Sequence, residues 1–314
     1  MYKWILACVL ALVTAMAGSV GAAGYSIYEQ GTAAMGQASA FTARADDPSA
    51  IFFNPAGIAG QEAAIHLGAT LILPSSEFDG DNPYPGISTH EKMKTGVFYP
   101  PHVFIVYPTN SVTLGLGLYA PFGLGTEWKD DFSGRAVSKF AEIQTIYLNP
   151  VVAKKFGPVS VGVGVEVVYS TVALKRTVMM PVVYGDDVVW TDAAELDLEG
   201  DNGFSDYGFN AGVQYSPMEM LTVGARYQSK VETNHTGDAA FHVIEPVAAA
   251  FVPPEPAAVE AMIPMPAIWS VGVAVRPTDK LTVEANLVSM QWSAFDSLKM
   301  TFTEVANAHL SESI

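Results

Sequence analysis

The sequence predicts an all-β protein, a transmembrane antiparallel β-barrel, and three observations carry this prediction. The chain of 314 residues starts with an apolar leader and then contains many segments in which apolar and polar residues alternate. Only 15% of its residues are charged, against roughly 25% in soluble domains. No run of 18 or more apolar residues follows the leader. An exported, apolar chain without such a run is typical of barrels of the bacterial outer membrane.

Residues 1–23 are typical of a secretory signal peptide. Lys3 gives the leader a positive start, the stretch from Trp4 to Ala17 is apolar, and Gly21-Ala22-Ala23 supplies the small residues of a cleavage site. This apolar stretch is short for a membrane-spanning helix, so we expect export rather than an N-terminal anchor. The one cysteine, Cys8, lies in the leader. A disulfide framework and a cysteine-ligated metal site are therefore excluded.

Alternation with a period of two predicts the strands. In the segment Val161–Val167 every second residue is valine, and the intervening residues are Gly, Gly and Glu. Together with less regular candidates this gives about ten strands, at 64–73, 97–107, 114–119, 138–156, 161–169, 207–215, 221–228, 269–276, 281–288 and 297–305. The longer links are expected to be outer loops, at 75–94, 181–203 and 245–266, the last with room for a short helix at 257–262.

The alternation alone fits two folds. In a soluble sandwich the apolar face covers the core, whereas in a membrane barrel it meets lipid and the polar face lines the lumen. Aromatic residues stand near the ends of the predicted strands, where a barrel has its interfacial girdle: Tyr207, Tyr215, Tyr227, Trp269 and Trp292. With the leader and the low charge, these positions favour the barrel over the sandwich.

Residues 24–60 do not alternate and are rich in Gly and Ala. They fit either a flexible arm or a plug, called a hatch, inside the lumen. We expect a hatch at 24–60 and the barrel at 61–314. Within the hatch, Asn54-Pro55-Ala56 is expected to form a rigid turn in which the Asn54 side chain bonds nearby backbone. Asp46 and Asp47 are expected to pair with lumenal Arg or Lys and to help hold a closed state.

Several short motifs follow one another in an order that is specific, although none of them is specific alone. They are Ala23–Glu29, Gly36-Gln37-Ala38, Ala45-Asp46-Asp47, Asn54-Pro55-Ala56, Pro121–Leu124, Tyr147–Pro150, Tyr207–Gly212, Pro264–Trp269 and Gln291–Phe295. Across nearly the whole chain this order resembles the FadL family of outer-membrane transporters for long-chain fatty acids and other hydrophobic compounds (FadL/TodX-like). The resemblance implies a fourteen-stranded barrel with an N-terminal hatch, located in the outer membrane of a Gram-negative bacterium.

The resemblance implies passive uptake of long-chain fatty acids, whose carboxylate is bound by basic residues in the lumen. Arg176 matches one of these residues, and an arginine in a partly dry lumen can bind a carboxylate with two hydrogen bonds. The alternative for Arg176 is a rim arginine that pairs with lipid headgroups or an acidic loop. The resemblance also implies a lateral gate at Pro121, Phe122 and Gly123, because proline and glycine weaken a strand. The alternative for these three residues is a turn at a strand end.

Other charged residues are predicted to face the lumen from the alternation of their strands. Arg226 and Lys230 are candidate ligand-binding residues on one strand face, and Glu166 and Glu284 are expected to face inward on other strands. The interpretation we prefer for all four is a salt-bridge network that supports the hatch.

The sequence contains no pattern that predicts an enzyme. Gly115–Ala120 matches a dinucleotide-loop pattern, but Pro121 follows where that motif requires a helix. We therefore predict no catalytic residues, no metal site and no cofactor. A net charge of −16 makes nucleic acid an unsuitable partner. The expected partners are a hydrophobic small molecule, outer-membrane lipid and lipopolysaccharide, and the outer-membrane assembly machinery.

The chain departs from the resemblance at its end. About ten predicted strands fall short of fourteen, and His309–Ile314 lacks the terminal aromatic residue that the assembly machinery reads. Because an open barrel would leave two unpaired edges in lipid, we expect a chain that lacks about four C-terminal strands. Two functional alternatives stay open: an aromatic hydrocarbon channel of the same fold, and a surface adhesin or structural barrel that transports nothing.

Overall fold

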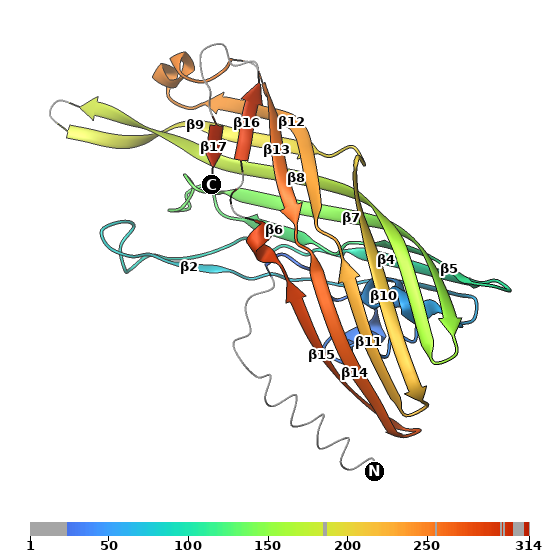
Figure 1. Ribbon diagram of the computed structural model, residues 1–314. Coiled ribbons are helices and arrows are strands. Elements are labelled where there is room, and N and C mark those ends of the chain that lie inside the picture. Colours follow the sequence, from blue (N-terminus) through green and yellow to red (C-terminus); the bar gives the residue numbers. More distant parts are fainter. Residues whose placement is uncertain are drawn as a thin grey trace.

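The computed structural model describes residues 24–184, 187–254, 256–295, 297, 299–303 and 311–313 (Figure 1). Within them, fifteen strands form one sheet and two more form a separate hairpin, which confirms the all-β prediction. The helices are short, and none in the described part of the chain has the length and apolarity to cross a membrane. The predicted signal peptide, residues 1–23, lies outside the described residues.

All strand pairings are antiparallel. The separate hairpin consists of β2 (Glu77–Asp79) and β3 (His90–Lys92). The strands of the sheet are β1 (Ala64–Ala69), β4 (Pro101–Pro108), β5 (Thr113–Tyr119), β6 (Gly123–Glu127), β7 (Phe140–Phe156), β8 (Val159–Tyr184), β9 (Asp187–Asp201), β10 (Asp206–Met218), β11 (Leu221–Gln228), β12 (Val231–Val243), β13 (Ala257–Met265), β14 (Ile268–Thr278), β15 (Leu281–Met290), β16 (Lys299–Thr303) and β17 (Ser311–Ser313).

The sheet divides into two branches beyond the long strand β8 (Figure 1). The first half of β8 pairs with β10, and the second half pairs with β9. One branch continues through β11, β14 and β15, and the other through β12, β13, β16 and β17. Among the described residues no pairing joins β1 to β15 or β17. Closure of the sheet into a barrel, and the strands predicted to be missing, therefore stay predictions.

All three predicted loops contain strands, and 75–94 includes the hairpin of β2 and β3. Residues 181–203 form the end of β8 and the whole of β9, and the two strands pair up to Tyr184 and Asp187 with one register shift between Val178 and Met179. The helix predicted at 257–262 is wrong, because these residues belong to β13, and the nearest helix is the short 3-10 turn η2 (Pro246–Ala250). Ala257, Val259 and Ile263 are buried on one face of β13, so this segment does alternate, although its proline and alanine content obscures the period.

The sheet has two different faces. The face that carries residues 24–60 is called the covered face here, and the opposite one the outer face. On β8 the even-numbered residues Gly162, Glu166 and Val168 lie on the covered face, whereas Val161, Val163 and Val165 are 39–53% exposed on the outer face. Exposed leucines on β5 and β7 extend this apolar outer surface. A soluble sandwich would bury such a surface, whereas a membrane protein presents it to lipid.

The predicted aromatic girdle is present in part. Tyr207, Tyr215 and Trp269 are 48–65% exposed on the outer face. Trp292 is an exception, because its ring packs edge-on against Tyr25 with the ring centroids 4.7 Å apart. Trp292 lies on the short 3-10 turn η3 (Trp292–Ala294), where the strand alternation has ended, so a position in the girdle is wrong for this residue.

The N-terminal segment, residues 24–60, is compact. It contains α2 (Thr32–Met35), α3 (Ala50–Phe53) and the 3-10 turn η1 (Pro55–Ile58). Five of its large apolar side chains are at most 1% exposed: Phe41, Ile51, Phe52, Phe53 and Ile58. They pack into one core with side chains of the covered face. This packing differs from the flexible-arm alternative, whereas the plugging of a lumen stays a prediction.

Candidate functional site

A group of apolar side chains lies on the covered face at a distance from the N-terminal segment. We call it the distal apolar cluster. Its buried members, on β9, β12, β13 and β16, are Leu196, Leu198, Ala239, Val259 and Met300. Partly buried side chains pack against them, including Leu174 and Val178 of β8. Strands from both sides of β9 thus supply one apolar surface.

Arg176 belongs to the edge of this surface. It stands between Leu174 and Val178 on β8, so the period of two places it on the same face. The residue directly opposite in β9 is Leu196, which is 1% exposed. The neighbouring basic residue Lys175 points to the other face, where its Nζ pairs with Asp197 at 2.6 Å. Of the two neighbouring basic residues, Arg176 is therefore the one that lies on the same face as the distal apolar cluster.

The predicted gate residues interrupt a strand rather than end it. Both β5 and β6 pair with β7, and residues 120–122 separate them. At the interruption the Thr145 hydroxyl of β7 donates to the Phe122 carbonyl at 2.7 Å and accepts from the Phe122 N–H at 3.1 Å. A side chain thus replaces the missing ladder bonds. The alternative of a turn at a strand end does not describe this geometry.

The N-terminal segment closes the interruption from the covered face. Ser26 pairs with Phe122 in an antiparallel bridge. The Ile27 N–H donates to the Pro121 carbonyl at 2.7 Å, and the Gly123 N–H donates to the Tyr25 carbonyl at 2.8 Å. Burial raises the pKa of Tyr25 to about 12, so its phenol stays neutral. The candidate gate is therefore occupied by residues 25–27.

Arg226 and Glu166 both lie on the covered face, as the alternation predicts. Arg226 is 2% exposed and Glu166 is fully buried. The Arg226 guanidinium donates to the Gln228 side-chain oxygen and lies 5.1 Å from the centre of the Phe52 ring. The Tyr119 hydroxyl donates to Glu166 at 3.2 Å. No direct ion pair joins the two charges, so a salt bridge between them does not form in the described structure.

Lys230 differs from the predicted inward orientation. Its side chain is exposed and pairs with Glu232 at 2.6 Å. The reason is that β11 ends at Gln228 and β12 begins at Val231. The two intervening residues change which side of the chain faces inward, from even-numbered residues in β11 to odd-numbered residues in β12. A role of Lys230 in ligand binding stays a prediction.

The Asn54-Pro55-Ala56 turn holds the N-terminal segment against the sheet. The Asn54 amide donates to the Thr42 carbonyl at 2.8 Å and to the Val213 carbonyl of β10 at 3.1 Å, and its oxygen accepts from the Ala56 N–H at 3.2 Å. This confirms the predicted bonding to nearby backbone. A Cβ at Gly162 would collide with Pro55, and one at Gly212 with Asn54, so the turn lies directly on two glycines of the sheet.

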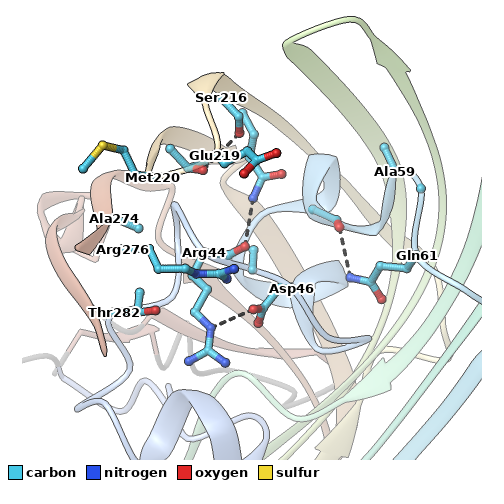
Figure 2. A pocket seen from close by; sticks show the side chains of 15 residues that line it. Arg44, Asp46, Ala59, Gln61, Ser216, Glu219, Met220, Ala274, Arg276 and Thr282 are labelled. Atoms are coloured by element: carbon cyan, nitrogen blue, oxygen red, sulfur yellow. Dashed lines mark hydrogen bonds and ion pairs between the residues drawn. The ribbon is translucent and has the colours of Figure 1, made fainter. Parts of the chain in front are cut away.

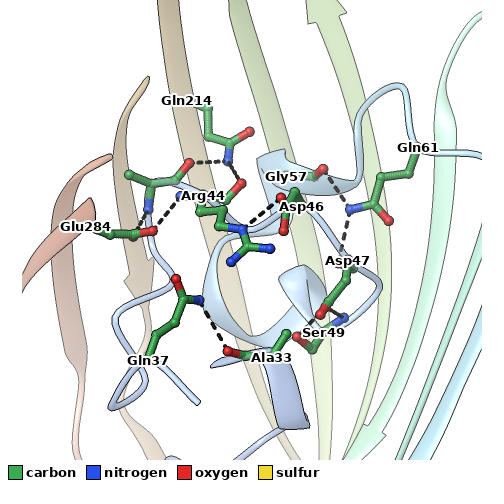
Figure 3. Close-up of polar contacts among 11 residues, drawn as sticks. Ala33, Gln37, Arg44, Asp46, Asp47, Ser49, Gly57, Gln61, Gln214 and Glu284 are labelled. Carbon is green, nitrogen blue, oxygen red and sulfur yellow. Dashed lines mark hydrogen bonds and ion pairs between the residues drawn. The ribbon is translucent and has the colours of Figure 1, made fainter. Parts of the chain in front are cut away.

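Asp46 pairs with an arginine, as predicted, but with one of the N-terminal segment itself, whereas Asp47 pairs with Ser49 rather than with Arg or Lys. Asp46 accepts from Arg44 at 2.8 Å, and Asp47 accepts from the Ser49 N–H at 2.8 Å (Figure 3). Both partners are two residues away, and short local contacts of this kind form more readily than distant ones.

The pairing with the sheet instead uses backbone groups of the segment. Glu284 of β15 accepts from the N–H groups of Ala43 at 2.8 Å and Arg44 at 3.1 Å. Gln214 of β10 donates to the Ala43 carbonyl at 2.8 Å (Figure 3). Sequence reasoning placed Glu284 inward but missed this role, because a bond to a backbone group leaves no signal in the partner's residue type.

A pocket of about 270 Å³ opens beside these contacts (Figure 2). It is lined by Arg44 and Asp46 of the N-terminal segment and by side chains near the ends of β10, β11, β14 and β15, including Arg276. Among the described residues, no three His, Cys, Asp or Glu side chains come together in a way that could hold a metal ion. The pocket mixes both charge signs and is polar, unlike the distal apolar cluster.

Comparisons with known proteins agree with this geometry. Residues 13–313 match the family described as outer membrane protein transport protein (OMPP1/FadL/TodX). A putative outer membrane protein of Neisseria meningitidis serogroup B is 38% identical over 133 residues, which are 39% of this chain and 28% of that protein. The long-chain fatty acid transport protein of Escherichia coli O6:H1 is 27% identical over 255 residues, which are 75% of this chain and 56% of that protein. The chain therefore spans less than two thirds of the length of both relatives.

Solved structures show the same fold at low sequence identity. The structure of a Pseudomonas aeruginosa FadL homologue superposes with a TM-score of 0.72 at 22% identity, covering 90% of this chain and 72% of the other. The Ralstonia pickettii toluene transporter TbuX gives a TM-score of 0.64 at 18% identity, covering 85% and 74%. The chain belongs to the OMPP1/FadL/TodX family of outer membrane transport proteins of Gram-negative bacteria.

Proposed function

We propose that the protein takes up long-chain fatty acids passively across the outer membrane. The observation that carries this proposal is the position of Arg176 at the edge of the distal apolar cluster, opposite Leu196. A fatty acid needs both parts of this arrangement, an apolar surface for its chain and a cation for its carboxylate. No catalytic step and no cofactor are required.

The covered face offers a continuation from the distal apolar cluster toward the N-terminal segment. Val168, Val231, Ile263 and Met265 are buried apolar residues of this face, and they belong to the core that includes the N-terminal segment. A ligand that leaves Arg176 therefore meets apolar side chains until it reaches that segment. We propose that the segment acts as a hatch inside a closed barrel and that its displacement opens the path.

We further propose lateral exit at Pro121, Phe122 and Gly123. The support is the interruption between β5 and β6, which residues 25–27 occupy. If these residues withdraw, the sheet has no ladder bonds at 120–122 and a ligand can pass sideways into lipid. The apolar outer face of the sheet fits outer-membrane lipid as a partner, whereas lipopolysaccharide and the assembly machinery stay predictions.

The uptake experiment uses cells that express the protein and compares labelled oleate with labelled toluene. Arg176→Ala should lower oleate uptake by about tenfold or more, because a hydrogen bond to a charged group is worth about 1.5–3 kcal/mol. Lys175→Ala is the matched control, since Lys175 lies on the outer face with Asp197, and it should leave oleate uptake unchanged. Toluene uptake that stays the same in Arg176→Ala would support a hydrocarbon channel instead. Uptake of neither ligand would support the structural alternative.

The exit experiment uses a disulfide between Ser26→Cys and Phe122→Cys. These residues are direct antiparallel partners, and the distance between such partners, about 4.5–5.5 Å between Cα atoms, suits a disulfide. Because Cys8 is the one cysteine of the chain and lies in the predicted leader, no other thiol competes. Oxidation should stop oleate uptake and reduction should restore it, whereas each single-cysteine variant should not respond. Uptake that survives complete cross-linking would rule out this exit.

A further inference from the structure

Arg226 is a buried cation with unused hydrogen-bond capacity. A guanidinium carries five N–H donors, and buried charges in proteins are normally paired. In the described structure Nη2 donates to Gln228, whereas Nε and Nη1 are buried and donate to no atom. The residue opposite Arg226 in β14 is Ser270, whose buried hydroxyl lies near the Tyr28 hydroxyl. The guanidinium therefore has more N–H donors than its bond to Gln228 uses.

The neighbouring acidic group is also incompletely bonded. Glu166 accepts from Tyr119 through one oxygen, and its other oxygen, Oε2, is buried and accepts from nothing in the described structure. The Arg226 charge acts on Glu166, and the buried Tyr28 hydroxyl lies close to both Arg226 and Ser270. Native proteins leave few buried polar atoms unpaired. Such a concentration of them around one guanidinium indicates a site for a further polar group.

The N-terminal segment covers this site. Phe52 of α3 lies over the Arg226 guanidinium, 5.1 Å from ring centre to Cζ, in a cation–π contact. Tyr28 packs edge-on against the same Phe52 ring at 5.2 Å. The cation is therefore held under two aromatic side chains of the segment that we propose to be the hatch.

We infer that Arg226 is an inner carboxylate site, that the N-terminal segment covers it, and that the nearby Glu166 carboxylate opposes the binding of a ligand carboxylate there. This inference rests on the proposed function. A carboxylate that reaches Arg226 forms hydrogen bonds with Nε and Nη1 and replaces the contact with Phe52. Because Phe52 belongs to α3, its release loosens the segment. A neutral ligand such as a hydrocarbon or an alcohol cannot replace that contact, so the site makes opening specific for carboxylates.

Glu166 sets the threshold of this response. When Glu166 is ionised, a ligand carboxylate at Arg226 brings a second negative charge next to it, and like charges in a buried site repel strongly. Removing the Glu166 charge while keeping its shape should therefore let the ligand occupy the site more readily. Glu166→Gln removes a negative charge from the site and Arg226→Gln removes the positive one. The two variants should therefore change the response to oleate in opposite directions.

The experiment is hydrogen exchange of residues 42–58 in the purified protein in detergent, with oleate or oleyl alcohol as the probe. Oleate should raise the exchange rate of this segment by about tenfold, the factor that corresponds to the loss of a cation–π contact of ordinary strength. Oleyl alcohol should not raise it. With Arg226→Gln, oleate should still bind through Arg176 but should no longer raise the exchange rate. With Glu166→Gln, the rise should occur at a lower oleate concentration.

The controls separate this inference from the proposed function. If the protein binds and transports no oleate, the proposed function fails. If oleate binds and raises exchange equally in the unmodified protein and in Arg226→Gln, or if oleyl alcohol acts as well as oleate, the inference is overturned. The double variant Glu166→Gln/Arg226→Gln removes both buried charges. It should fold, as judged by heat-modifiable electrophoretic mobility, and oleate should not raise its exchange rate. The inference can therefore be tested even if Arg226→Gln alone does not fold.

Discussion

The N-terminal segment contacts the sheet in two different ways on its two sides. On the side of β5, Ile51 and Ile58 lie directly on the glycines of that strand, where a Cβ at Gly115 or Gly117 would collide with them. On the side of β10 and β15, the contacts are the hydrogen bonds of Gln214 and Glu284 to the backbone of Ala43 and Arg44. We call these the apolar side and the polar side of the segment.

The two sides should respond differently to water. On the apolar side, separation exposes hydrocarbon and gains nothing in return, so its cost follows the area exposed. On the polar side, water can replace each hydrogen bond, so the net cost of separation is small although the bonds are direct. We therefore expect the segment to stay attached at β5 and to open first at β10 and β15. The pocket lined by Arg44 and Arg276 lies on this polar side.

The largest effect is expected from Ile51→Ala on the apolar side. Ile51 is fully buried, and truncating a buried isoleucine to alanine costs about 2–5 kcal/mol, because apolar contact is lost and a cavity is left. Hydrogen exchange of residues 42–58 should show a local opening free energy lower by this amount. Leu116→Ala, on the outer face of the same β5, is the control and should leave the exchange unchanged. Equal effects of the two variants would contradict the comparison.

Asn54→Ala should have the next largest effect, because Asn54 joins the segment to β10. Its amide is buried, and its removal leaves the carbonyls of Thr42 and Val213 without these donors, at a cost of about 1–3 kcal/mol. Asn54→Asp is the informative second variant, since it retains an acceptor for the Ala56 N–H but loses both donated bonds. Thermal unfolding and exchange should rank it with Asn54→Ala. If it behaves like the unmodified protein, the two donated bonds contribute nothing.

The sequence predicted strands well where alternation is regular. The segment Val161–Val167 and the Leu114–Tyr119 segment are strands with their apolar residues on the outer face, as the period of two requires. It failed at 181–203 and 257–262, where charged or proline-containing segments still pair with neighbouring strands. Pairing satisfies the backbone there, and no residue-level pattern reports a partner that is distant in the sequence.

The candidate site shows the same division. Glu166, Arg226 and Glu284 face the side that alternation assigned to them, because parity within one strand is a local property. Lys230 does not, because the break between β11 and β12 changes the parity. The glycines under Asn54-Pro55-Ala56 were visible in the sequence as the polar half of an alternation, but their reason, the close approach of another segment, depends on the tertiary structure.

A smaller effect is expected from Glu284→Gln, which tests the polar side alone. The carboxylate accepts from two successive N–H groups; the amide retains one oxygen and turns an NH₂ group toward the other donor. We expect an opening free energy lower by about 1–2 kcal/mol, as for the loss of one hydrogen bond to a charged acceptor. The exchange should increase at residues 42–46 before it increases at residues 50–58. A uniform increase over both would mean that the segment opens as one unit.

The smallest effect is expected from Asp46→Asn. This variant tests whether the Arg44–Asp46 ion pair helps to hold the polar side of the segment on the sheet. The Arg44–Asp46 ion pair is within the segment, and its side chains are 32% and 41% exposed. Exposed pairs contribute about 0–1 kcal/mol and weaken in salt. Exchange of residues 42–58 in Asp46→Asn should therefore match the unmodified protein to within about 0.5 kcal/mol at high salt. A larger loss would show that the pair positions the backbone groups of Ala43 and Arg44 for Glu284 and Gln214, and that the polar side depends on its surface charge as well as on its buried bonds.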